Sequence, residues 1–203
     1  VRNGSATLMI KVVGSGSAWL AGREIGDALD MLGPLGRPFD HTGTGARLLV
    51  AGGTGIVPLY FLYRRMEAAD VQPVLLWGME GGEDYSALPH TLKKEIDLRL
   101  ACEEGTLGIQ GKVLDLMDGL DLDRYEGVYA CGPRGMLADL AEKVDMMGFK
   151  TFQVSLEERM ACGVGACRGC AVPSVSSAGE YLMACSDGPV FDGKDLDWER
   201  IKE

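Results

Sequence analysis

The chain has 203 residues, of which 46% are hydrophobic and 25% charged, and its formal net charge is −10. This acidic balance disfavours nucleic acid as a partner, because phosphate binding needs clustered Lys and Arg side chains. No apolar run approaches the roughly 20 residues that a membrane helix requires, and no signal peptide is visible. Of the six cysteines, Cys102 and Cys131 stand alone in apolar surroundings and look like reduced thiols, and the whole set favours a cytoplasmic protein.

Residues 1–40 are expected to form the end of a β domain. Strands are predicted over Ala6–Val13 and Ile25–Leu32, with the turn Gly14–Ser17 after the first. Gly33–Gly36 then breaks the chain. Because two or three strands cannot bury both of their faces, we expect this part to lean on the next domain or to lack strands upstream.

Residues 41–156 alternate predicted strands and helices, which indicates a five-stranded parallel, doubly wound sheet. The strands are predicted over Arg47–Ala51, Pro73–Trp77, Leu98–Cys102, Val128–Cys131 and Phe152–Leu156. The helices are predicted over Val57–Ala69, Ala87–Ile96, Lys112–Met117 and Met136–Met147. Ligands of such sheets bind at the carboxyl ends of strands, near the point where the strand order reverses.

Two turns fall at the carboxyl ends of predicted strands. The first, Gly52-Gly53-Thr54-Gly55, precedes a helix, so its backbone amides can approach a pyrophosphate. It is not the G-x-G-x-x-G fingerprint, and a tight strand-to-helix connection explains it equally well. The second, Cys131-Gly132-Pro133, places Cys131 either at the ligand crevice or in the core, the commoner location of a lone thiol.

Glu80, Glu83 and Asp84 follow the second predicted strand. An acidic side chain there can bind a ribose 2′-hydroxyl, whereas a 2′-phosphate calls for Arg. No Arg or Lys lies between Trp77 and Asp84, so the sequence favours NAD over NADP. A solvated acidic loop explains each of these residues at least as well.

Residues 157–203 contain four cysteines with the pattern C-x4-C-x2-C-x14-C: Cys162, Cys167, Cys170 and Cys185. The first three have the spacing of a plant-type [2Fe–2S] loop. The glycines between them permit a backbone that coils around a cluster. A zinc site or two disulfides are the alternatives, but zinc ribbons favour two C-x2-C pairs and disulfides suit small secreted scaffolds. A hairpin of Ala171–Pro173 with Tyr181–Met183 is predicted beside the loop.

The order of these motifs resembles the ferredoxin–NADP reductase superfamily. More narrowly, Glu158–Cys170 and Gly188–Phe191 are similar to the electron-transfer subunits of the dihydroorotate dehydrogenase B family, and the likeness covers residues 6–198. The resemblance implies the C-terminal part of an FAD-binding β-barrel over 1–40, an NAD-binding α/β domain over 41–156 and a small [2Fe–2S] domain over 157–203. The first barrel strands and the family's upstream Arg-x-x-Ser stretch are absent from this sequence.

The resemblance also implies a role for particular residues. FAD would be held by Met9-Ile10-Lys11 and Gly16-Ser17. NAD would be held by the two turns: Gly52, Gly53, Thr54, Gly55, Cys131, Gly132 and Pro133. The cluster would be held by the four cysteines, and no side chain is assigned a catalytic role.

The implied activity is an electron relay that is part of pyrimidine biosynthesis. NADH, FAD and the cluster would exchange electrons with an FMN-containing catalytic subunit that interconverts dihydroorotate and orotate, in a hetero-oligomer. Alternatives are a subunit of a sulfide dehydrogenase or of an NADPH–ferredoxin oxidoreductase, and a non-enzymatic regulatory module with a structural zinc or a sensing cluster. A chain that keeps the fold without FAD is a further alternative.

Overall fold

The computed structural model describes residues 7–82, 85–86, 96–175 and 180–202. It divides into two compact units, residues 1–34 and residues 35–203. The predicted helix Ala87–Ile96 lies outside the described residues except for its last position. Within the described parts, no helix is long and apolar enough to cross a membrane.

The first unit contains one short helix, α1 (Ser15–Ala21), and no strand among residues 7–34. The hydroxyl of Ser17 accepts hydrogen bonds from the amides of Val13 and Gly14, at 2.9 and 3.1 Å, which fixes the start of α1. The two strands predicted here are therefore wrong. An apolar extended segment becomes a strand only where a neighbour pairs with its amides, and no described segment does so. Side chains such as Val13 and Met31 stay exposed.

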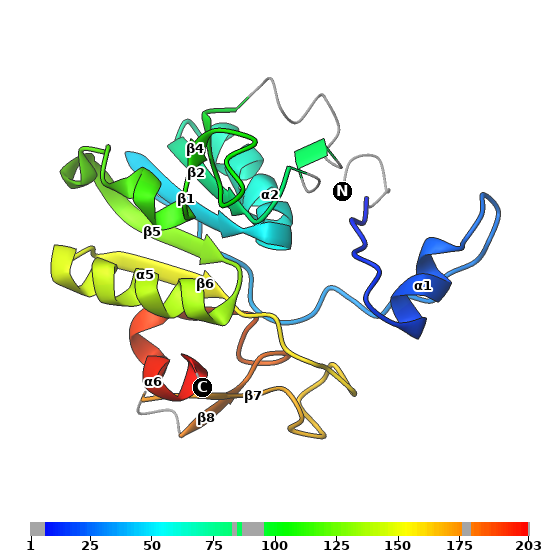
Figure 1. Cartoon of the computed structure of the whole chain (residues 1–203). Helices are drawn as coiled ribbons and strands as arrows, with labels where there is room; N and C mark the ends of the chain where they lie inside the picture. Colours follow the sequence, from blue (N-terminus) through cyan, green and yellow to red (C-terminus); the bar gives the residue numbers. More distant parts are fainter. Residues whose placement is uncertain (1–6, 83–84, 87–95, 176–179, 203) are drawn as a thin grey trace. The chain divides into compact units, whose positions relative to one another are not determined.

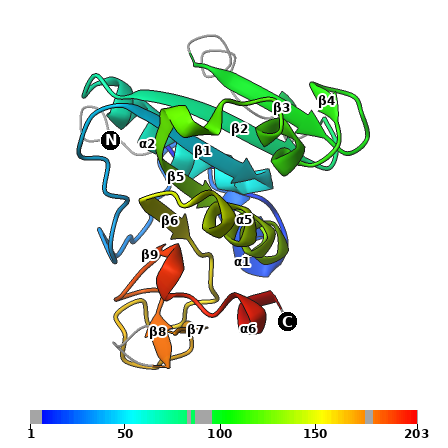
Figure 2. The same ribbon diagram turned by 90° about the vertical axis from the view of Figure 1, so that its left-hand side faces the viewer.

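The second unit is built on a seven-stranded sheet (Figures 1 and 2). Its central strands are parallel and lie in the order β3 (Leu98–Cys102), β2 (Gln72–Met79), β1 (Ala46–Gly52), β5 (Tyr125–Cys131) and β6 (Thr151–Ser155). These five confirm the predicted strands. The chain builds outward from β1 in both directions, so the order reverses between β1 and β5.

Two further strands make the predicted number of five too low. β4 (Ile109–Gln110) runs parallel to β3, and β9 (Val190–Asp192) runs antiparallel to β6. Both are too short to show a periodic pattern in the sequence. Because β9 comes from the cysteine-bearing segment, that segment shares a sheet with the strands that carry the two turns.

Helices cover both faces of the sheet, as Figure 1 shows. α2 (Ile56–Glu67) packs on the face that carries Leu49 and Ala51, and α5 (Arg134–Met147) packs on the face of Leu48 and Val50. The α2 residues predicted for the buried side are indeed buried: Leu59, Leu62, Tyr63 and Met66. The predicted helix over 112–117 is a 3-10 helix, η2 (Val113–Met117); shorter 3-10 turns are η1 (Gly53–Gly55), η3 (Leu122–Arg124) and η4 (Gly193–Asp195).

The C-terminal segment adds a small hairpin and a last helix. β7 (Ala171–Pro173) pairs antiparallel with β8 (Tyr181–Met183), which confirms the predicted hairpin. α6 (Trp198–Lys202) packs on α5 and buries Ile201. This segment and the sheet form one compact unit, and the proposed boundary between residues 156 and 157 stays a prediction.

Candidate metal centre and nucleotide site

The hairpin brings the last two cysteines of the pattern together. Cys170 directly precedes β7, and Cys185 follows β8 by two residues. Because Ala171 pairs with Met183 and the amide of Ala184 donates to the carbonyl of Cys170 at 3.0 Å, both cysteines lie at the same end of the hairpin. Their sulfur atoms are 3.3 Å apart, and both residues are buried.

The loop that precedes the hairpin directs backbone amides at sulfur atoms. Gly165 donates to Cys185 Sγ at 3.0 Å, Cys167 donates to Cys162 Sγ at 3.4 Å, and Gly169 donates to Cys167 Sγ at 3.4 Å. The glycine-rich sequence makes this possible, since Gly163 and Gly165 have φ values of 72° and 79° that a side chain disfavours. Donors of this kind stabilise negative charge on sulfur.

The four thiols form two pairs. Cys170 and Cys185 make the buried pair, while Cys162 interacts with the thiol of the exposed Cys167. The amides of Cys167 and Val164, followed by the Cys167 thiol, lower the pKa of Cys162 to about 6. The Cys170 thiol and burial raise the pKa of Cys185. In the part of the chain that the structure describes, no three Cys, His, Asp or Glu side chains converge as one metal-binding group, and all six cysteines are free thiols.

The two predicted nucleotide turns interlock at the carboxyl ends of β1 and β5. A Cβ atom on Gly55 would lie 2.2 Å from the carbonyl oxygen of Cys131, and one on Gly52 would lie 2.6 Å from Cδ of Pro133. A Cβ atom on Gly132 would lie 2.9 Å from the amide nitrogen of Gly52. Glycine is therefore required on both sides of this contact, at the point where the strand order reverses.

Two buried residues, Trp77 and Cys131, lie at these turns. The indole N–H of the buried Trp77, at the end of β2, donates to the carbonyl of Gly53 at 2.9 Å. Cys131 is buried, and this burial, reinforced by the carboxylate of Glu157, raises the pKa of its thiol to about 12. Cys131 is thus a core residue whose thiol stays neutral, and only its backbone reaches the turn.

The residues predicted to hold FAD lie in the first unit. Met9, Ile10 and Lys11 are exposed, whereas Gly16 and Ser17 belong to α1. Ser17 uses its hydroxyl on the backbone of Gly14, to whose carbonyl it donates at 3.0 Å. The structure does not bring these five residues together around a cavity, so their role stays a prediction.

The acidic residues after β2 are only partly described. Glu80 is exposed and directly follows the strand, where the sequence predicts a ribose contact. Glu83 and Asp84 lie outside the described residues. Glu80 thus has the required position, and the assignment of NAD over NADP stays a prediction.

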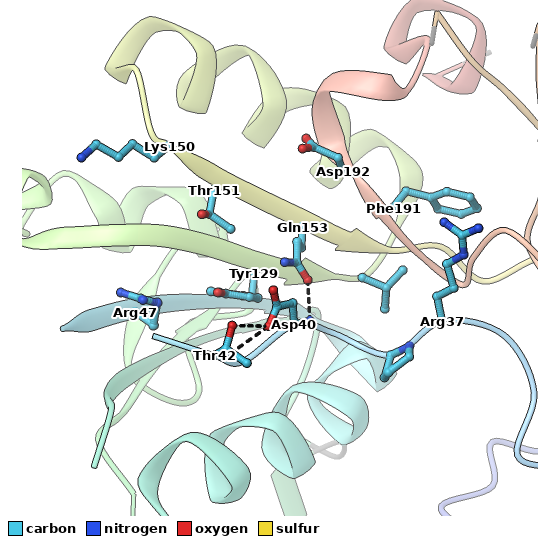
Figure 3. Close-up of a pocket in the computed structure, with 12 residues that line it drawn as sticks. Arg37, Asp40, Thr42, Arg47, Tyr129, Lys150, Thr151, Gln153, Phe191 and Asp192 are labelled. Atoms are coloured by element: carbon cyan, nitrogen blue, oxygen red, sulfur yellow. Dashed lines mark hydrogen bonds between the residues drawn. The ribbon is translucent and has the colours of Figure 1, made fainter. Parts of the chain in front are cut away.

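A cavity of about 400 Å³ lies on the α2 side of β5, β6 and β9 (Figure 3). Its lining includes Arg47, Tyr129 and Gln153, and Gln153 accepts a hydrogen bond from the amide of Asp40 at 2.9 Å. Arg47 and Thr151 lie at the starts of their strands, so the cavity is at the opposite end of the strands from the two turns. It is separate from the turns predicted to bind a nucleotide.

Comparison with known proteins identifies relatives of this chain. Residues 157–197 match a family model described as the iron–sulfur cluster binding domain of dihydroorotate dehydrogenase B. The dihydroorotate dehydrogenase B (NAD(+)) electron transfer subunit of Bacillus caldolyticus is 37% identical over 199 residues, which cover 94% of this chain and 73% of the relative. The subunit of the same name from Desulforamulus reducens is 35% identical over 203 residues, with 97% and 76% covered.

A solved structure gives the same result for the fold. NADH-dependent reduced ferredoxin–NADP oxidoreductase, studied for flavin-based electron bifurcation, superposes with a TM-score of 0.79 at 32% sequence identity. The match covers 95% of this chain and 68% of that one. From these matches together, the chain belongs to the family of dihydroorotate dehydrogenase B electron transfer subunits.

Proposed function

We propose that this protein passes electrons between NAD(H), FAD and a [2Fe–2S] cluster, and exchanges them with an FMN-containing catalytic subunit of a dihydroorotate dehydrogenase. The observation that carries the proposal is the contact of 3.3 Å between the sulfurs of Cys170 and Cys185. These cysteines are fifteen residues apart in the sequence, and their approach at one end of the hairpin supports a role as a pair of ligands.

The thiols fit a two-iron cluster better than a single zinc ion. Each iron of such a cluster takes two of the four thiolates, and the chain offers one buried pair and one outer pair. A lone zinc ion would draw all four sulfurs to about 2.3 Å from one point. The amides of Gly165, Cys167 and Gly169 suit a cluster, because hydrogen bonds to the sulfurs tune its potential.

The nucleotide is proposed to bind at the interlocked turns. The backbone amides of Gly53, Thr54 and Gly55 lead into α2, whose first turn carries no acidic side chain. Unsatisfied N–H groups and the helix dipole at such a position favour a pyrophosphate. Gly132 and Pro133 would contact the nucleotide from the neighbouring strand, and the position of Glu80 directly after β2 supports a contact with a ribose hydroxyl, which favours NAD.

When bound, the flavin converts a hydride pair into single electrons and the cluster carries them one at a time. The chain's own residues hold and orient these groups, and none is needed as an acid or base. We assign residues 1–40 to the flavin-binding part, 41–156 to the NAD-binding part and 157–203 to the cluster-binding part. Several apolar side chains of residues 7–34 are exposed, which supports a contact of this unit with another protein segment. The six free thiols favour a cytoplasmic location.

The partner is proposed to approach the outer pair of thiols. Cys167 is exposed, and the apolar side chains of Met160 and Val164 are 48% and 58% exposed beside it. Exposed apolar groups around a redox centre are typical of a protein contact. A partner that docks here would lie close to the proposed cluster, so electrons would not have to pass through the rest of the chain.

Anaerobic purification tests the proposal. The expected protein is brown, holds two irons and two sulfides per chain, and gives a rhombic electron paramagnetic resonance signal on reduction. Added FAD should allow NADH to bleach both flavin and cluster. A colourless protein with one zinc per chain would overturn the proposal.

A second candidate is a subunit of an NADPH–ferredoxin oxidoreductase. The match to NADH-dependent reduced ferredoxin–NADP oxidoreductase, at 32% identity, favours it. Isolation of the natural complex separates the two: a catalytic partner that carries FMN and oxidises dihydroorotate supports the first, and a larger flavoprotein that reduces ferredoxin supports the second.

A further inference from the structure

The lead-in to the thiol loop is held by few contacts. After β6, the amide of Leu156 donates to the carbonyl of Pro189 at 2.9 Å. From Glu157 to Gly169, the described residues make no backbone–backbone hydrogen bond. Among the described residues, the hydrogen bonds of this stretch join amides to cysteine sulfurs, and one ion pair is present. No backbone–backbone hydrogen bond therefore ties this stretch to the sheet.

That ion pair joins the loop to the nucleotide turn. The guanidinium Nη2 of Arg134 donates to Oε1 of Glu158. Arg134 is the first residue of α5 and directly follows Pro133, whereas Glu158 lies four residues before Cys162. One member therefore directly follows the turn that packs on Gly52, and the other belongs to the segment that leads into the cluster loop.

The two side chains differ in burial. The Glu158 side chain is 12% exposed, and the Arg134 side chain is 49% exposed. The loss of Arg134 would leave a mostly buried carboxylate without its partner, which is costly. The loss of Glu158 would leave an arginine that water can solvate. Removal of the arginine should therefore be the more harmful change.

Glu157 shows that the same segment passes close to the end of β5. Its carboxylate contributes, after burial, to the raised pKa of the Cys131 thiol. Cys131 is the last residue of β5, and its carbonyl oxygen faces Gly55. Glu157 thus lies near the carboxyl end of β5, and Glu158 lies near the start of α5. Of the two, only Glu158 makes an ion pair among the described residues.

We infer that Arg134 and Glu158 are positioning residues, which clamp the cluster loop to the nucleotide turn and so set the rate at which electrons from the nucleotide, passed on by the flavin, reach the cluster. The inference rests on the proposed function. Small displacements of reacting groups have large effects on rate, and this is the one ion pair that joins the stretch from Glu157 to Gly169 to another element among the described residues. Among the described residues, neither side chain makes a hydrogen bond to the four thiols or to the glycines of the nucleotide turn, so both act through position.

The test uses the full chain with reconstituted cluster and FAD, in four variants: Arg134→Gln, Glu158→Gln, the charge exchange Arg134→Glu with Glu158→Arg, and Lys202→Gln as control. Lys202 makes an ion pair of 2.6 Å with Asp139 of α5, away from the thiol loop. Stopped-flow absorbance measures NADH-driven reduction of the cluster. Iron content, the NADH dissociation constant and hydrogen exchange of residues 163–170 are measured on the same samples.

Arg134→Gln is expected to slow reduction of the cluster about tenfold while the NADH dissociation constant changes by less than about twofold. Glu158→Gln should slow it less, the exchanged pair should recover most of the wild-type rate, and Lys202→Gln should match the wild type. Hydrogen exchange of residues 163–170 should quicken in Arg134→Gln and return in the exchanged pair.

A wild-type rate and unchanged exchange in Arg134→Gln would overturn the inference, as would an exchanged pair no better than either single variant. If NADH fails to reduce the wild-type cluster, the proposed function fails; the hydrogen-exchange comparison then still decides whether the pair clamps the loop. Iron content separates a displaced loop from one that has lost its cluster.

Discussion

The sulfur of Cys170 lies 3.3 Å from the sulfur of Cys185. This distance follows from the hairpin register, in which Ala171 pairs with Met183. A hairpin is a rigid spacer, so the two thiols remain a pair even though one belongs to the glycine-rich loop and the other follows β8. The remaining pair depends on a loop with little regular structure.

Cys185→Ser is therefore expected to abolish cluster binding, because one iron would keep a single thiolate from the chain. Cys170→Ser should have the same effect. Iron analysis and visible absorbance after anaerobic purification measure the loss. Cys102→Ser is the control: Cys102 is also buried, with its sulfur 3.2 Å from Oγ1 of Thr106, and this variant should keep its iron. Equal iron content in all three variants would rule out Cys170 and Cys185 as ligands.

The sequence predicts much of this centre because spacing and secondary structure act locally. Four cysteines, the intervening glycines and a short hairpin are all visible within about thirty residues of the printed sequence. The central parallel strands were equally predictable, since each is an apolar run followed by a helix or turn. The family resemblance stated from these motifs is confirmed by the relatives.

Contacts between distant segments were not predictable. The bond from Trp77 to Gly53 depends on the order of β2 beside β1, and the pair of Arg134 with Glu158 depends on the path after β6. β9 is three residues long and is stabilised by its pairing with β6 rather than by its own composition. The strands predicted within residues 7–34 do not form, because a segment with a strand pattern needs a pairing partner to become part of a sheet.

Gly55→Ala should disrupt the contact between the two turns. The new Cβ atom would lie 2.2 Å from the carbonyl oxygen of Cys131, and neither backbone can move without disturbing the sheet. We expect a loss of about 2 kcal/mol or more in the free energy of unfolding and a large rise in the NADH dissociation constant. Urea titration and fluorescence titration measure these two quantities.

Gly135→Ala is the matched control. Gly135 lies in the first turn of α5, where a Cβ atom would meet nothing within 4 Å, so alanine should be neutral or stabilise by up to about 1 kcal/mol. Similar losses in both variants would mean that the close approach of the two turns does not explain the loss in Gly55→Ala.

The Cys131 thiol predicts a dependence of stability on alkaline pH. Burial raises its pKa from 9.0 to about 12. Below pH 9 the thiol is neutral in the folded and unfolded states, so it contributes no pH dependence. Between pH 9 and 12 only the unfolded state ionises, so the free energy of unfolding should fall by about 1.4 kcal/mol per pH unit.

Cys131→Ser removes this ionisation while it keeps the size of the side chain. Urea unfolding of both proteins at pH 8.0, 9.5 and 10.5 isolates the contribution, since all other groups titrate in common. The difference between wild type and variant should stay constant up to about pH 9 and then shrink or reverse. Parallel curves across the whole range would show that the thiol is accessible to water.

Arg168 is the last residue to test, because its backbone conformation conflicts with its identity. It lies between Cys167 and Gly169 with a φ of 56°, a left-handed conformation in which most side chains are strained. At the other positive-φ positions of the loop the sequence has glycine, Gly163 and Gly165. Strain that persists next to a functional group often reflects a requirement of that group.

Arg168→Gly should therefore be more stable than Arg168→Ala by about 1 kcal/mol, because both lose the charge and only glycine relieves the strain. Thermal unfolding of the cluster-loaded proteins measures the difference. The exposed Arg159 is the control, since it has no positive φ among the described residues; there glycine should be the less stable replacement, because it adds freedom to the unfolded chain. The same order of glycine and alanine at both positions would show that the left-handed turn at Arg168 does not persist in solution. If glycine is the more stable replacement at position 168 and alanine at position 159, the left-handed turn exists in solution. Arg168 then lowers the stability of the fold, and its role lies in the charge and contacts that it gives the cluster loop.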